Sequence, residues 1–244
     1  MVTGACPISV VIPAYQAASL LRRTVGDVLN QTLAPSEIIV VDDGSTDATA
    51  EVARSFGERV HYVYQENAGV AAARNRGIAA ASAEWIAFLD ADDGWSPDHL
   101  ERCWDVIQRD RSLAWCCGGH TIISLDGSEQ RMPTKRWMQL KSTRETSLLF
   151  FDAVVAGAPL QTSGFLISQD VIRAVGLFDP NLRCGEDRDY WYRIALHYPR
   201  IGFVWPPTVR YIQTEGSVTW GYGDEADRLL ETVRRNVARL DGLE

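Results

Sequence analysis

Two carboxylates one residue apart, Asp90 and Asp92, stand at the end of the apolar run Phe88-Leu89. Alternate residues leaving a strand point the same way, so these carboxylates converge, and the small Ala91 between them leaves room for a ligand. Carboxylates so close together repel each other unless a positive charge lies between them. Mg²⁺ and Mn²⁺ take oxygen ligands and are commonly shared with substrate phosphates. The pattern therefore indicates a divalent cation held together with a phosphorylated ligand.

Two other groups of residues also fall where predicted strands end. Pro13-Ala14-Tyr15 follows a predicted strand over residues 9–12, and Asp42-Asp43 follows one over residues 37–41. In an open parallel sheet, ligands bind outside the carboxyl ends of the strands, at the crevice where the strand order reverses. Taken singly, an acid after a strand can merely start the next helix, and a tyrosine there can be a core ring. Three motifs at three strand ends together predict one shared site.

The elements that must position these residues alternate between strand and helix, which predicts a parallel sheet. The predicted strands cover residues 9–12, 37–41, 60–64 and 85–89. Helices are predicted around residues 21–29, from the cap residues Ser45-Thr46-Asp47 to Phe56, over residues 69–81, and from Ser96 as N-cap with Pro97 as the first helical residue.

The second half of the chain is mixed. Residues 113–123 and 165–168 are predicted strands, residues 187–197 a helix, and the polar, basic residues 126–145 a loop. A last helix from about Asp224 has an apolar stripe that packs on the core or, as the alternative, pairs two copies into a homodimer. The stripe consists of Ala226, Leu230, Val233, Val237 and Leu240.

Composition and charge exclude some functions. Lys and Arg number 24 and Asp and Glu number 32, giving a net charge of -8. A nucleic-acid partner is therefore not expected, because phosphate-binding surfaces need an excess of Lys and Arg. The five cysteines form no CxxC pair and no zinc spacing, which favours reduced, mostly buried thiols. With no signal peptide and no apolar stretch of about 20 residues, we expect a cytoplasmic protein without a transmembrane segment, able to touch a membrane peripherally.

Several motifs follow one another in a specific order. They are Val10–Tyr15, Val41–Asp47, Asn67-Ala68-Gly69 with Ala73-Arg74-Asn75, Phe88–Asp93, Gly176–Asp179 and Gly185–Trp191. Over about residues 8 to 195, their order and spacing resemble the large family-two glycosyltransferases of GT-A fold. The resemblance implies an α/β fold with a Rossmann-like, mostly parallel sheet and helices on both faces. It also implies one domain over residues 1–244, with a nucleotide-sugar-binding half at about 6–95, an acceptor half at about 96–220 and a C-terminal helix at about 222–244.

The resemblance implies an inverting transferase that moves one sugar from a nucleotide-diphosphate sugar to an acceptor hydroxyl. Pro13, Ala14 and Tyr15 would cradle the nucleoside, with Tyr15 stacking on the base. Asp43 would accept a hydrogen bond from the base imide N–H, which favours a UDP-sugar first and a dTDP-sugar next over purine nucleotides. Gly69 would belong to the same nucleotide-sugar site.

The other implied roles surround the diphosphate and the ribose. Arg74 would reach the base or the diphosphate from the third helix. Asp90 would face the ribose, with Ala91 beside it at the nucleotide-sugar site. Asp92 would hold Mn²⁺ or Mg²⁺ bridging the diphosphate.

Asp187 would be the catalytic base. It falls at the first turn of a predicted helix, after Gly185, which lets the backbone turn tightly. The base must lie across the sugar from the cation, on an element outside the nucleotide half, and this position meets that need. The alternative is that Glu186, Asp187 and Asp189 are helix-start acids favoured by the helix macrodipole.

The chain departs from the family pattern in two places. Many members carry a His after the last core strand, whereas Tyr211–Ser217 has none, so Glu215 or water would complete the metal shell. The QxxRW motif of processive members is absent, because Arg136-Trp137 lies upstream of Asp187 and lacks the Gln. We therefore expect single transfers onto a saccharide or lipid-linked saccharide, with a protein or small metabolite left open as acceptor.

Other classes of protein fit the sequence less well. A sugar-nucleotide pyrophosphorylase needs a Gly-rich, basic loop after the first strand, and Pro13-Ala14-Tyr15-Gln16 is not one. Gly221–Ala226 matches GxGxxA, but too few residues follow for a dinucleotide-binding unit. The remaining alternative is a catalytically inactive sugar-nucleotide-binding or scaffold protein, against which the intact Asp92 and Asp187 argue.

Overall fold

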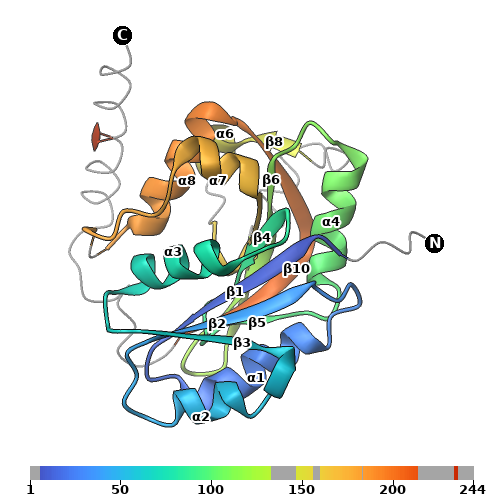
Figure 1. Ribbon diagram of the computed structural model, residues 1–244. Coiled ribbons are helices and arrows are strands. Elements are labelled where there is room, and N and C mark those ends of the chain that lie inside the picture. The colour runs from blue at the N-terminus through green and yellow to red at the C-terminus, as the bar shows by residue number, and fades with distance from the viewer. Residues whose placement is uncertain (1–5, 133–146, 156–159, 183, 214–233, 236–244) are drawn as a thin grey trace.

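The hydrophobic runs of the first half form a parallel sheet, as the alternation of strand and helix predicts. The computed structural model describes residues 6–132, 147–155, 160–182, 184–213 and 234–235 (Figure 1). β1 (Ile8–Ala14), β2 (Glu37–Asp43), β3 (His61–Gln65) and β4 (Trp85–Phe88) lie parallel in the order β3-β2-β1-β4. The four predicted strands are confirmed.

The helices of the first half lie on opposite faces of this sheet. α1 (Ala18–Leu29) and α2 (Thr49–Arg54) cover one face, the short turn η1 (Gly57–Arg59) follows α2, and α3 (Val70–Ala80) covers the other face (Figure 1). The strand order therefore reverses at β1, which lies between β2 and β4. Ligands of open α/β sheets bind outside the carboxyl ends of the strands at such a point. The predicted site motifs lie at this edge.

The second half extends the same sheet. The order continues from β4 through β9 (Phe165–Ser168), β6 (Trp115–Ile123), β10 (Arg200–Ile212) and β5 (Gly94–Trp95), while β7 (Glu129–Met132) pairs with β6 and β8 (Ser147–Leu149) with β10. β9 runs antiparallel to both β4 and β6. Its amino end, preceded by the 3₁₀ turn η2 (Thr162–Gly164), therefore lies at the edge that carries the carboxyl ends of its neighbours.

Two apolar layers hold the sheet between the helices. α4 (His99–Arg109) packs with α1 and α2 on one face, and α6 (Phe150–Val155), α7 (Gln169–Val175) and α8 (Glu186–His197) pack with α3 on the other (Figure 1). In the second layer Phe165 stacks between Trp115 and Trp191, with ring centroids 5.8 and 3.9 Å away. This stack fixes α8, whose first turn carries the predicted base, against the sheet.

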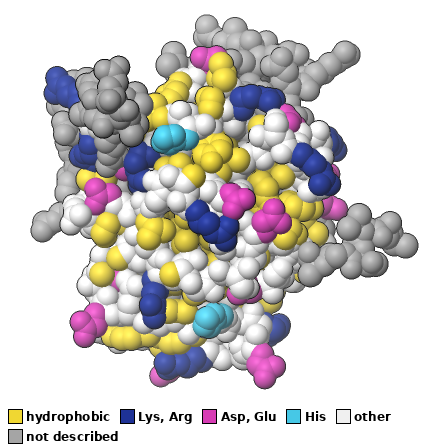
Figure 2. Space-filling view, turned by 45° about the horizontal axis from the view of Figure 1, so that its top comes forward, with side chains coloured by type: hydrophobic (Ala, Val, Ile, Leu, Met, Phe, Trp, Pro, Cys, Tyr) yellow, Lys and Arg dark blue, Asp and Glu magenta, His cyan; other side chains and the backbone are white. Residues whose placement is uncertain are grey.

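The surface carries mixed charge. On the face drawn in Figure 2, Lys and Arg side chains alternate with Asp and Glu, and the described residues there form no broad basic patch. Within the described ranges, no helix has the length and apolarity needed to cross a membrane. The thiols of Cys6, Cys103, Cys116 and Cys117 are free and buried, as predicted.

Three boundary predictions are wrong. α2 begins at Thr49 after Ala48 and ends at Arg54, so the predicted cap residues Ser45-Thr46-Asp47 do not occupy its N-cap. Ser96 does not cap α4: its hydroxyl donates to Asp98, and the helix begins at His99 because the two residues before it form a turn. Residues 126–145 are not all loop, because β7 pairs antiparallel with β6, and a strand at a sheet edge tolerates polar residues. Residues 133–146 and nearly all of the helix predicted from Asp224 lie outside the described residues, so the homodimer alternative stays a prediction.

Gly77 lets α3 approach β1 closely. A Cβ atom there would overlap Cγ1 of Val11, whereas a Cβ on Gly26 of α1 meets nothing within 4 Å. Gly77→Ala should lower the free energy of unfolding by about 1–3 kcal/mol through overpacking. Gly26→Ala should raise it by about 0.5–1 kcal/mol, since Ala is preferred to Gly inside a helix. Urea unfolding followed by circular dichroism measures both, and equal effects would contradict this close packing.

Candidate active site

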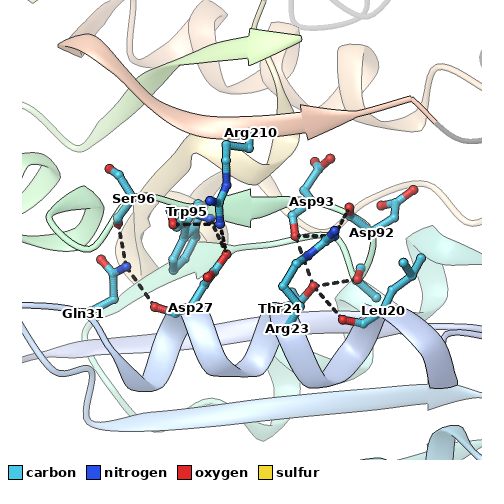
Figure 3. A network of polar contacts seen from close by, with 11 residues as sticks. Leu20, Arg23, Thr24, Asp27, Gln31, Asp92, Asp93, Trp95, Ser96 and Arg210 are labelled. Atoms are coloured by element: carbon cyan, nitrogen blue, oxygen red, sulfur yellow. Dashed lines mark hydrogen bonds and ion pairs between the residues drawn. The ribbon is translucent and has the colours of Figure 1, made fainter. Parts of the chain in front are cut away.

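The loop after β4 carries three acids and is anchored on α1 through its main chain. Thr24 donates hydrogen bonds to the carbonyls of Ala91 (2.7 Å) and Asp93 (3.1 Å). Arg23 donates to the carbonyl of Asp92 (2.6 Å). Figure 3 shows the carboxylates of Asp92 and Asp93 pointing away from α1. The loop is thus fixed on one side and turns its carboxylates toward the other.

Asp92 and Asp93 lie in different surroundings. Asp93 is fully buried, and its carboxylate accepts hydrogen bonds from the Ser163 hydroxyl (2.5 Å) and the Gln161 amide (3.2 Å). Burial, together with Asp90 and Asp92 nearby, raises the pKa of Asp93 to about 8. Asp92 is half-buried, and burial and the neighbouring Asp90 raise its pKa as well. Asp93 therefore ties the loop to the second half, and Asp92 is the carboxylate that remains for a ligand.

Arg74 lies buried between two carboxylates from distant parts of the chain. Its guanidinium contacts Asp90 at 2.8 Å and Glu186 at 3.0 Å, and lies over the ring of Phe178. Burial lowers the pKa of Arg74, but attraction to the two carboxylates outweighs it and raises the pKa above its ordinary value. The guanidinium Nε has no hydrogen-bond partner within the described ranges. Arg74 thus joins the loop after β4 to the start of α8.

The first turn of α8 presents two adjacent acids. Gly185 precedes it with a φ of 75°, in the left-handed region that the predicted tight turn requires. Glu186 faces Arg74; burial and the adjacent Asp187 raise the pKa of Glu186 against the attraction to the guanidinium. The carboxylate of Asp187 accepts a long hydrogen bond, 3.4 Å, from the hydroxyl of Thr162. Asp187 therefore lies one residue from the ion pair that links α8 to Asp90.

The loop after β1 presents Tyr15 to solvent. Pro13 and Ala14 are buried, whereas 56% of Tyr15 is exposed. Gln16 has a φ of 50°, unusual for a non-glycine residue. Its side-chain oxygen accepts hydrogen bonds from the main chain of Thr46 (3.0 Å) and Asp47 (3.1 Å), which ties this loop to the one after β2. The exposed ring of Tyr15 thus rests on an ordered turn.

Asp43 organises the loop before α3. Its carboxylate accepts hydrogen bonds from the Gln65 amide (2.7 Å) and from the main-chain N–H groups of Ala68 and Gly69, both at 2.9 Å. A carboxylate accepts about four hydrogen bonds, so roughly one position remains for another donor. Gly69 adopts a φ of 89°, which favours glycine at this turn.

The predicted site residues form two groups at one edge of the sheet. Arg74 and Asp90 are in direct contact, with Asp92 two residues after Asp90. Arg74 also contacts Glu186, which carries no predicted role in the site and is adjacent in sequence to Asp187. The loops with Tyr15, Asp43 and Gly69 lie at the ends of β1 and β2 and before α3. The sequence does not predict that Asp93, Thr162 and Ser163 belong to the site. The run of acids around Asp93 indicates a functional loop, but local sequence does not show which of its carboxylates turns inward. Thr162 and Ser163 belong to no motif.

The family model described as Glycosyl transferase family 2 matches residues 9–160, more than half of the chain. The chain belongs to glycosyltransferase family 2. The resemblance predicted from the motifs is confirmed.

Several relatives share only part of their length with this family member. A protein named "Putative teichuronic acid biosynthesis glycosyltransferase TuaG" from Bacillus subtilis is 38% identical over 125 residues, 50% of this chain and 49% of that protein. The uncharacterized glycosyltransferase RT0329 of Rickettsia typhi is 30% identical over 190 residues, 76% of this chain and 58% of that protein. The chain thus spans about half to three-fifths of the length of these relatives.

Solved structures show the fold. S. aureus TarS 1-349 in complex with UDP-GlcNAc superposes with a TM-score of 0.71 at 18% identity, covering 93% of this chain and 64% of that one. The same protein in complex with UDP gives a TM-score of 0.65 at 17% identity, covering 85% and 60%. This member of the family has the GT-A fold that its sequence predicts.

The double ion pair of Arg74 should dominate local stability. Arg74→Gln leaves Asp90 and Glu186 without their cation in a largely buried place, so the free energy of unfolding should fall by about 3 kcal/mol. Arg102→Gln removes a comparable contact with Asp98, but on the surface, and should cost below about 1 kcal/mol. Urea titration of both variants measures the difference. A loss for Arg74→Gln no larger than that for Arg102→Gln would contradict the proposed importance of this pair.

Proposed function

We propose that this protein is an inverting glycosyltransferase that transfers a single sugar from a nucleotide-diphosphate sugar to an acceptor hydroxyl. One observation carries the proposal: the loop with Asp90 and Asp92 and the first turn of α8 with Asp187 meet at Arg74. The loop with Asp90 and Asp92 lies where open α/β sheets bind nucleotides. Asp187 lies on α8, in the second half of the chain, and a base that acts opposite the leaving group must come from an element outside the nucleotide-binding loops.

The donor is proposed to be a UDP-sugar, with a dTDP-sugar next. The carboxylate of Asp43 retains room for about one donor, which an imide N–H of uracil or thymine would fill. The exposed ring of Tyr15 would stack on that base. TarS, which shares the fold, has been crystallised with UDP and with UDP-GlcNAc, and this supports the same choice.

The acids of the β4 loop fit a hard divalent cation such as Mg²⁺ or Mn²⁺. Asp92 offers carboxylate oxygens, and the carboxylate of Asp90 lies close enough to raise its pKa. Among the described residues, no three His, Cys, Asp or Glu side chains gather into a metal site by themselves. The donor diphosphate, water or Glu215, which lies outside the described residues, would complete the shell. When bound, the cation would stabilise the charge that develops on the departing diphosphate.

Asp187 is proposed as the general base. The acceptor oxygen attacks the anomeric carbon from the face opposite the diphosphate, and a positioned carboxylate takes its proton as the bond forms. The adjacent Glu186 is held in the ion pair with Arg74. We therefore assign removal of the acceptor proton to Asp187, whose carboxylate has only a long hydrogen bond with the side chain of Thr162.

The acceptor is proposed to be a saccharide or lipid-linked saccharide in polysaccharide biosynthesis, because the name of the relative TuaG refers to teichuronic acid biosynthesis. The competing proposal is an inactive protein that binds sugar nucleotides. Incubation with a panel of nucleotide sugars and candidate acceptors, with detection of the released nucleotide diphosphate, separates the two. Release supports the transferase; binding of the sugar nucleotide without release supports the inactive protein.

Nucleoside stacking by Tyr15 can be tested with a matched control. Tyr15→Ala should weaken uridine binding roughly tenfold, because stacking on a base contributes about 1–3 kcal/mol. Tyr64 is equally exposed, at 56%, but lies on β3, so Tyr64→Ala should leave uridine affinity unchanged. Isothermal titration calorimetry with uridine measures both. Equal affinities of Tyr15→Ala and the unsubstituted protein would show that Tyr15 does not hold the base.

Asp187→Asn keeps the shape of the side chain and removes its basicity. Transfer should fall about 10²–10⁴-fold, with UDP binding nearly unchanged. Asp170→Asn is the control for a mere helix-start acid, because Asp170 occupies the first turn of α7, where it is exposed. It should leave the transfer rate unchanged. A near-normal rate for Asp187→Asn would sink the assignment of the base while leaving donor recognition intact.

A further inference from the structure

The turn η2 reaches the site from the acceptor half. It precedes β9, the strand that runs antiparallel between the parallel strands β4 and β6. The amino end of such a strand lies beside the carboxyl ends of its neighbours. The chain from Gln161 to Ser163 therefore passes directly beside the loop that follows β4.

Two side chains of this segment hold the acid loop. The hydroxyl of Ser163 donates to the Asp93 carboxylate at 2.5 Å and accepts from the main-chain N–H of Asp90 at 3.1 Å. The amide of Gln161 donates to the same carboxylate at 3.2 Å. Ser163 and Asp93 are both fully buried. These contacts fix the main chain at the point where Asp90 leaves the sheet.

The residue between them faces the proposed base. The hydroxyl of Thr162, which is buried, donates to the carboxylate of Asp187 at 3.4 Å. In a 3₁₀ turn, with three residues per turn, successive side chains point about 120° apart. Within η2 the side chain of Thr162 therefore points toward α8 and that of Ser163 toward the acid loop.

The turn itself has little freedom to move. The carbonyl of Ser163 accepts a hydrogen bond from the indole of Trp95 at 2.6 Å. Gly164 packs so tightly on β6 that a Cβ atom there would lie 2.8 Å from the carbonyl oxygen of Gly118. A rigid turn therefore contacts both acidic groups at once.

We infer that η2, with Gln161, sets the position of the donor-binding acid loop relative to the base, with Thr162 positioning Asp187 and Ser163 positioning the Asp90–Asp93 loop. This inference rests on the proposed function, because the proposed function makes Asp187 the base and Asp92 the metal ligand. Neither Thr162 nor Ser163 takes part in proton transfer or in metal binding. Each acts through the carboxylates or the main chain that it holds.

Thr162→Val removes the hydroxyl and keeps the shape of the side chain. The kcat for release of UDP from the nucleotide sugar should fall about tenfold, because a hydrogen bond to a charged group is lost, with KM for the donor unchanged. Thr162→Ser should restore most of the loss. Thr208→Val is the matched control: Thr208 is a buried threonine whose hydroxyl bonds to His99, and its loss should leave kcat unchanged. An equal fall in both Val variants, no fall in Thr162→Val, or no rescue by Ser overturns the assignment.

Ser163→Ala tests the other contact without turnover. UDP binding in the presence of Mn²⁺ should weaken about tenfold, whereas uridine binding should not change, because only the acid loop loses its anchor. Ser163→Cys, nearly isosteric, gives the same comparison if the Ala variant does not fold. Equal UDP affinity, or equal weakening of UDP and uridine, overturns the inference. An unsubstituted protein that binds UDP but releases none from any nucleotide sugar contradicts the proposed function, and the Ser163 comparison still decides the inference about the loop.

Discussion

The site depends on the buried guanidinium of Arg74, which lies among several carboxylates. Arg74 is almost completely buried, and its two ion pairs join the end of β4 to the start of α8. Asp92 and Asp187 lie beside these pairs, so with Asp90 and Glu186 the region holds more negative than positive charge. The raised pKa values of Asp92 and Asp93, caused first by burial and then by neighbouring carboxylates, express the same imbalance. Such a site is suited to a ligand that arrives with a divalent cation.

Close packing of the helices on the sheet holds Arg74 and its two carboxylate partners in position. The close approach of α3 to β1 at Gly77 brings Arg74, three residues earlier on the same helix, to the end of β4. On the other side, the aromatic stack through Phe165 and Trp191 holds α8 against the sheet. The antiparallel strand β9 then places η2 between the two acidic groups. The first and second halves of the chain therefore share one sheet, and the candidate site forms where they meet.

Local pattern was enough to predict much of this. The strands of the first half, the acids and Tyr15 at their carboxyl ends and the tight turn at Gly185 each depend on a few adjacent residues. The contacts that bring these elements together depend instead on residues far apart in the sequence. Arg74 and Glu186 lie 112 residues apart, and Ser163 and Asp90 lie 73 apart. No periodicity indicates that Arg74 pairs with Glu186, that β9 runs antiparallel, or that Asp43 receives its donors from the loop before α3.

The stereochemistry of the product distinguishes a single displacement from a mechanism that retains the configuration of the donor. A single displacement, with Asp187 on one side of the sugar and the diphosphate on the other, inverts the anomeric carbon. Proton NMR of the product, formed from a UDP-sugar of known configuration and the acceptor found by screening, reports the new configuration through the anomeric coupling. With Asp187 as the base of a single displacement, we expect the configuration opposite to that of the donor. A product that keeps the donor's configuration would contradict this mechanism.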